Sequence, residues 1–181
     1  MMSKRFRTTT VFAIALACLA LSSQSNARSQ ITIHSPAFEE GKEIPSKYTC
    51  SGQDLSPPLK WESVPSEAKS LALIVSDPDA PRGTFIHWVV YNLPARLTEL
   101  GEDILKEPVV KGGGQQGKND ADDYGYHGPC PPPGAPHHYH FKIYALDSDL
   151  QLQSGATAAD VEKAMKGHVL ATGELVGIFG R

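Results

Sequence analysis

The sequence predicts a mostly β domain, a β-sandwich or β-roll with one helix near its C-terminus and long ordered loops. The strongest signals are two apolar, β-branched runs in the middle of the chain, at 70–76 and 84–92. The 16 glycines and 14 prolines of the 181-residue chain are typical of short strands joined by turns, and they argue against a helical bundle. Helical segments do not alternate with the strands, which disfavours a doubly wound α/β fold.

The predicted strands are short and are bounded by turn residues. The run 70–76 is continuously apolar and ends at Asp77-Pro78, which indicates a strand buried on both faces. The segment 84–92 is aromatic and β-branched, and Leu93-Pro94 ends it. In chain order, strands are expected at 31–33, 59–61, 70–76, 84–92, 138–146 and 169–179.

One helix is expected before the last strand. Thr157 is a candidate N-cap, Asp160 stands three residues later as in a capping box, and Gly167 is a stop signal. The segment 111–136 has neither helical nor strand character, because it is rich in glycine and carries five prolines from residue 129 onward. We therefore expect this segment to be an irregular loop.

The first 27 residues have the pattern of a secretory signal peptide. A basic start with Lys4, Arg5 and Arg7 precedes an apolar run at 11–21 and a small-x-small cleavage site at 25–27. The run is too short to span a membrane. Lipoprotein processing at Cys18 is the alternative. We expect a secreted or periplasmic protein whose single domain covers residues 28–181.

The charge of the exported chain excludes two classes of partner. The full chain has a formal net charge of −3, and removal of the signal peptide takes away positive charges only, leaving about −6. Such a chain is not a general nucleic-acid binder and would be repelled by anionic bilayers, so no stable membrane insertion is expected. Of the three cysteines, Cys50 and Cys130 stay in the domain, where a disulfide and two free thiols are both open.

Four of the seven histidines lie close together in the sequence, namely His127, His137, His138 and His140. Alternation along a strand places His137 and Tyr139 on one face and His138 and His140 on the other. The second pair could hold a metal ion or simply cover the strand. The first pair lies beside a loop in which Gly128 permits close backbone approach, a combination that suits an anion.

A second candidate site follows the buried run at 70–76. Asp77-Pro78-Asp79 would deliver carboxylates to the rim of a sheet, although such a sequence is also typical of an Asx turn. His87 lies on the next strand, where alternation predicts that it shares a face with Val89 and Tyr91. A lone histidine in a strand is more often a core residue than a ligand.

Together these motifs resemble the phosphatidylethanolamine-binding protein family, and more narrowly its bacterial Raf-kinase-inhibitor-like branch. The resemblance runs in order over about residues 31–179. It is carried by DPDAP at 77–81, HWVVYN at 87–92, GPCPP at 128–132 and HHYHF at 137–141.

The resemblance implies two antiparallel sheets with a C-terminal helix, and a small anion-binding pocket at the rim of a sheet. It assigns that pocket to Asp77, His87, Gly128, His137 and Tyr139. The chain departs from the family pattern at His138, where relatives carry arginine, and this puts any salt bridge of that arginine in doubt.

From these observations we expect an exported binding protein for small anionic or phosphorylated ligands, without metal or cofactor. In such a pocket Asp77 would fix an imidazole tautomer, while His87, His137 and the Tyr139 hydroxyl would donate to the anion. A hydrolase that uses the Asp/His pocket for acid–base chemistry is the alternative. A protein partner and a homodimer are also open.

Overall fold

The structure of the protein, a computed structural model, describes residues 29–181. The expected signal peptide and Cys18 lie outside the described residues. Within residues 29–181, none of the helices has the length and apolar character needed to cross a membrane.

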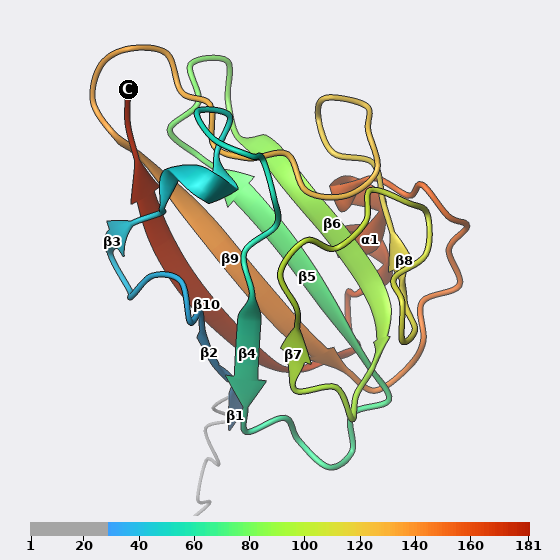
Figure 1. Cartoon of the computed structure of the whole chain (residues 1–181). Coiled ribbons are helices and arrows are strands. Elements are labelled where there is room, and N and C mark those ends of the chain that lie inside the picture. Colours follow the sequence, from blue (N-terminus) through green and yellow to red (C-terminus); the bar gives the residue numbers. More distant parts are fainter. Residues whose placement is uncertain (1–28) are drawn as a thin grey trace, which may run out of the picture.

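Within the described residues, ten strands build two β-sheets (Figure 1). The strands are β1 (Ser29–Gln30), β2 (Thr32–His34), β3 (Lys42–Glu43), β4 (Leu59–Glu62), β5 (Ser70–Asp77), β6 (Phe85–Pro94), β7 (Glu99–Leu100), β8 (Gln115–Gln116), β9 (His137–Leu146) and β10 (Val169–Phe179). The larger sheet has the order β1-β10-β9-β5-β6-β8, with β3 also paired to β10, and the smaller sheet has the order β2-β4-β7. The predicted mostly β, two-sheet architecture is therefore confirmed.

The long strands pair antiparallel, as expected, but β1 and β3 run parallel to β10. Gly173 and Gly177 permit this pairing, because a side chain at either position would collide with Ile31 or with Ile44 and Phe38. The strands β1, β3, β7 and β8 were not expected. Each is only two residues long, which is too short to leave a periodic pattern in the sequence.

The central strand β5 separates two hydrophobic clusters, which confirms that it is buried on both faces. Leu71 and Leu73 face the first cluster, the intersheet core, whose members come from both sheets and include Trp61. Ala72 and Ile74 face the second cluster, which the helix α1 (Ala158–Ala164) covers. Each face of the larger sheet is thus closed by a different layer.

The helix begins as the sequence predicts. The Thr157 hydroxyl accepts from the Asp160 backbone N–H, and the Asp160 carboxylate accepts from the Thr157 N–H, which completes a capping box. The helix ends at Ala164, before Gly167, whose φ of 85° lies in the left-handed region. The helix is therefore shorter than its stop signal suggested.

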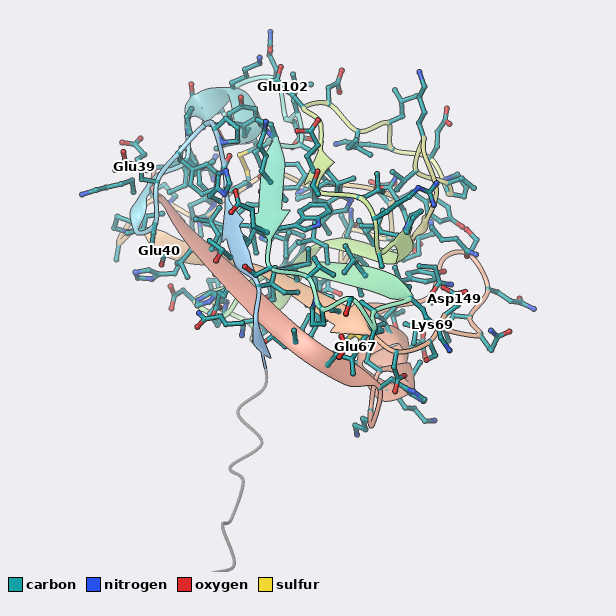
Figure 2. All side chains as sticks on the ribbon, turned by 90° about the horizontal axis from the view of Figure 1, so that it is seen from below. Glu39, Glu40, Glu67, Lys69, Glu102 and Asp149 are labelled. Carbon is teal, nitrogen blue, oxygen red and sulfur yellow. A yellow bond between two sulfur atoms is a disulfide. The ribbon has the colours of Figure 1, made fainter. Side chains whose placement is uncertain are left out.

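A short 3-10 helix, η1 (Ser46–Tyr48), was not expected from the sequence. Lys47 Nζ and the Tyr48 hydroxyl both contact the Glu102 carboxylate at 2.6 Å, and Figure 2 labels Glu102 near this turn. These contacts fix the 46–54 segment against the loop that follows β7. The segment matters for the site because it supports one of its walls.

Candidate functional site

A cavity of about 240 Å³ opens where β5 ends and where β6 and β9 begin. Asp77, His87 and His137, three of the five predicted site residues, line it. The other lining residues lie at 80–83 and 127–132, in the loops before β6 and before β9, and at Phe85, the first residue of β6. The segments that carried the resemblance therefore converge on one place at the rim of the larger sheet.

A β-bulge in β6 positions His87. Val75 of β5 pairs with Trp88, and the next residue, Ser76, pairs with Ile86, so that His87 is the extra residue of β6. A bulge of this kind interrupts the alternation of side chains and re-aims the inserted residue.

The prediction that His87 shares a face with Val89 and Tyr91 is therefore wrong. Val89 and Tyr91 belong to the cluster under α1, whereas His87 lies against Tyr139 of the intersheet core, with ring centroids 5.2 Å apart. Sequence alternation could not show this, because nothing in the residues themselves marks the extra position.

The hydrogen bonding of His87 fixes its tautomer. Its Nδ1 lies 2.6 Å from the His127 backbone carbonyl, and a carbonyl can only accept, so Nδ1 carries the proton. Burial of the ring lowers the pKa of His87 to about 4, with hydrogen bonding to the His127 carbonyl opposing the shift. His87 is therefore a neutral imidazole at pH 7.

Asp77 and His137 form a buried pair. His137 Nδ1 donates to Asp77 Oδ2 at 2.8 Å, and the side chains are 10% and 5% exposed, respectively. Asp77 Oδ1 accepts from the Asp79 N–H at 2.9 Å, so the Asx turn that the sequence suggested is also present. The tautomer that Asp77 fixes is that of His137.

Tyr139 lies behind the cavity rather than in its lining. Its ring centroid is 5.2 Å from that of His87 and 6.5 Å from that of His137. The residue is fully buried, and its hydroxyl has no hydrogen-bond partner among residues 29–181. Burial, with a smaller effect from the nearby Asp77 carboxylate, raises the Tyr139 pKa, so the group remains a phenol that can donate.

Gly128 makes a close backbone approach, but to another part of the chain. Its N–H donates to Asp54 Oδ1 at 2.6 Å, and a Cβ at this position would lie 2.8 Å from the Tyr48 carbonyl oxygen. Gly128 is not among the lining residues. The structure thus places it where it packs the wall of the cavity against the 46–54 segment.

A disulfide reinforces this wall. Cys50 and Cys130 are joined, with Cα atoms 5.4 Å apart, and Cys130 lines the cavity. The Cys50 N–H also donates to the Pro129 carbonyl at 3.1 Å. The proline-rich stretch is therefore an ordered wall of the cavity, held by covalent and hydrogen bonds.

Two of the lining residues that were not assigned to the site from the sequence carry a charged or titratable side chain outside the disulfide. Arg82 lies at the exposed rim, and His127 is half-buried beside His87, with ring centroids 6.1 Å apart. His127 belongs to the cluster of four histidines in the sequence, and Arg82 directly follows the Asp-Pro-Asp-Ala-Pro motif. Their proximity to the motifs was the available signal.

The other two clustered histidines lie outside the cavity lining and contact separate carboxylates. His138 Nδ1 lies 2.7 Å from Asp79 Oδ2, and His140 Nδ1 contacts Glu174. Within residues 29–181, no three His, Cys, Asp or Glu side chains are grouped so that they could hold a metal ion. His138 thus contacts a carboxylate of the neighbouring turn.

Comparison with known proteins identifies relatives across nearly the whole domain. A UPF0098 protein of Methanothermobacter thermautotrophicus is 50% identical over 145 residues, which cover 80% of this chain and 95% of that protein. A UPF0098 protein of Pyrococcus horikoshii is 51% identical over 150 residues, which cover 81% of this chain and 75% of that protein.

Two solved structures share the fold. A phosphatidylethanolamine-binding protein homologue of Chlamydia trachomatis matches with a TM-score of 0.78 and 43% identity, covering 84% of this chain and 99% of the other. E. coli YBCL, described as a new member of the mammalian PEBP family, matches with a TM-score of 0.77 and 32% identity over the same shares. The sequence model of the phosphatidylethanolamine-binding proteins matches residues 34–180. The chain therefore belongs to the phosphatidylethanolamine-binding protein family.

Proposed function

We propose that the protein is an exported binding protein that holds a small anionic or phosphorylated ligand in the cavity between β5, β6 and β9. The observation that carries this proposal is the polar lining: the Arg82 guanidinium and the His127 ring border the cavity, while Asp77, the one carboxylate that lines it within residues 29–181, is already engaged by His137. A volume of about 240 Å³ suits a small group rather than an acyl chain.

The disulfide supports the export part of the proposal. Disulfides persist in oxidising compartments and are rare in the cytosol of most organisms. Cys50 and Cys130 form a disulfide although both residues are exposed, and the N-terminal sequence has the pattern of a cleaved signal peptide. An exported protein would keep this covalent link in the wall of its cavity.

The alternative, a hydrolase, rests on the Asp77–His137 pair, which resembles a general base oriented by a carboxylate. Among the described residues, those that line the cavity include no serine or threonine, since Thr84 is not part of the lining, and the Cys130 sulfur is part of a disulfide. Covalent catalysis of the serine or cysteine type would need such a nucleophile. For this reason we propose binding rather than turnover.

The test is a thermal-shift titration of the purified protein with inorganic phosphate and with phosphorylethanolamine. A ligand at 100 times its Kd stabilises a protein by about 2.7 kcal/mol, which corresponds to roughly 5–10 °C in Tm for a domain of this size. We expect this shift for the native protein and for His138→Ala, whose side chain lies outside the cavity lining, and no shift for His137→Ala.

No shift in the native protein would refute the proposed ligand class. Release of phosphate from phosphorylethanolamine during the titration, measured on the same samples, would refute a purely binding role.

A further inference from the structure

The buried ring of His87 presents an acceptor, not a donor, to the cavity. Its Nδ1 carries the proton because it faces the His127 carbonyl at 2.6 Å, and a neutral imidazole has only one N–H. Its Nε2 therefore holds a lone pair. Among residues 29–181, no side chain or backbone group is hydrogen-bonded to this Nε2, and His87 lines the cavity.

The surroundings of His87 keep it in this state between about pH 5 and 8. Burial lowers its pKa to about 4. The charged and titratable groups around the ring come from four segments of the chain. They are Asp77 of β5, Arg82 at the rim, Asp120 and His127 of the long loop, and His137 and Tyr139 of β9.

We propose that the cavity selects anions that carry a proton: the bound group donates an O–H to His87 Nε2, so that hydrogen phosphate is accepted and sulfate is rejected. This rests on the proposed function, because it concerns which anion the same cavity takes. A sulfate ion has no proton at neutral pH, and its oxygen would face the Nε2 lone pair with neither partner able to donate. Leaving a buried acceptor without a donor is unfavourable.

The P–OH group could belong to inorganic phosphate or to the monoanion of a phosphomonoester, and the two sources differ in their response to pH. A phosphomonoester loses its last P–OH with a pKa of about 6, whereas inorganic phosphate still carries one P–OH at pH 8. Between pH 5 and pH 8 both ions gain one negative charge, but only the phosphomonoester loses its last P–OH. Comparing the two ions therefore separates the effect of losing the P–OH proton from the effect of the added charge.

The first measurement is the Kd of phosphate and of sulfate at pH 7 and equal ionic strength, by isothermal titration calorimetry on the native protein. Neither probe contains an amine, whose N–H groups could also reach His87. We expect phosphate to bind about tenfold to a hundredfold more tightly. Equal affinities would overturn the inference, while failure of both ions to bind would refute the proposed function instead.

The second measurement compares methyl phosphate with inorganic phosphate at pH 5 and at pH 8. We expect the Kd of methyl phosphate, divided by the Kd of inorganic phosphate, to rise about tenfold from pH 5 to pH 8, because methyl phosphate loses its P–OH over this range. Any change in the charge of the protein between the two pH values would affect both ligands and so cancels to first order in the ratio. A ratio that stays constant would overturn the inference.

The third measurement assigns the discrimination to His87. In His87→Gln the side-chain amide can turn an N–H toward the anion, so we expect the preference for phosphate over sulfate to fall at least fivefold. The matched control is His140→Gln. His140 contacts Glu174 on the face of β9 opposite to His137 and Tyr139, so this variant should keep the native ratio of the two affinities. A native ratio in His87→Gln would overturn the assignment, and if that variant does not fold, the two measurements on the native protein decide.

Discussion

Two neighbouring histidines of β9 meet two aspartates of one turn, yet their environments differ. His137 contacts Asp77 at 2.8 Å and His138 contacts Asp79 at 2.7 Å. The first pair points to the intersheet side and is 10% and 5% exposed, whereas the second is 52% and 42% exposed. The two pairs have the same chemistry, and only the strand alternation separates them.

Burial, rather than pairing with a carboxylate, is what distinguishes the pair at the candidate site from the pair outside it. The exposed pair exchanges its partner readily for water, and such pairs contribute little to stability. The buried pair cannot exchange its partner for water, so the orientation of the His137 ring is fixed. One Asp-Pro-Asp turn thus makes an exposed contact on one side of the strand and a buried contact at the candidate site on the other.

The buried pair and the exposed pair should differ most in how much each stabilises the folded protein. Asp77→Ala leaves His137 buried without its partner and should lower the free energy of unfolding by about 3 kcal/mol. Asp79→Ala should lower it by less than about 1 kcal/mol. Urea denaturation at pH 7 measures both, and equal losses in the two variants would contradict the argument from burial.

The sequence predicted this part of the site well, for a physical reason. Side chains on a strand alternate strictly, so the placement of His137 and Tyr139 opposite His138 followed from their numbers alone. The turn motif likewise predicted that Asp77 would lie at a sheet rim. Such local rules need no knowledge of the rest of the molecule.

The same rules failed where the geometry depends on a partner strand. The bulge at His87 is a property of the pairing between β5 and β6, so alternation within β6 alone placed His87 on the wrong face. The close approach of Gly128 to the 46–54 segment, rather than to the cavity, depends on a contact between distant loops. The pairing of Cys50 with Cys130, which the sequence left open, is a contact of the same long-range kind.

A positive charge on the buried His87 ring should lower the stability of the folded protein at acidic pH. The folded protein holds the pKa of His87 at about 4, below the 6.5 of an ordinary histidine, because the ring is buried. Between these values the unfolded chain binds more protons, so stability falls as the pH drops from about 6.5 to 4 and is fully regained at neutral pH.

At pH 4.5 this loss should amount to about 2–3 kcal/mol relative to pH 7. Urea denaturation of native protein and of His87→Gln at the two pH values isolates the contribution of His87. We expect the variant to lose less stability on acidification by that amount. Parallel losses in the two proteins would show that His87 is not held neutral by the fold.

The smallest expected effect concerns two buried tyrosines of the intersheet core. The Tyr126 hydroxyl donates to the Tyr48 carbonyl at 3.0 Å, whereas the Tyr139 hydroxyl has no partner within residues 29–181. Tyr126→Phe removes a satisfied hydrogen bond and should destabilise the protein by about 1 kcal/mol. Tyr139→Phe removes an unsatisfied group and should stabilise it by about 1 kcal/mol.

Both variants are measured by urea denaturation without added phosphate and again with it. The unpaired Tyr139 hydroxyl lowers the stability of the protein without ligand. Its position beside His87 and His137 is explained if a bound anion accepts a hydrogen bond from it. Phosphate should then stabilise Tyr139→Phe less than the native protein and stabilise Tyr126→Phe by the native amount. A native response to phosphate in Tyr139→Phe would assign the hydroxyl to the core alone and narrow the site to Asp77, His87 and His137.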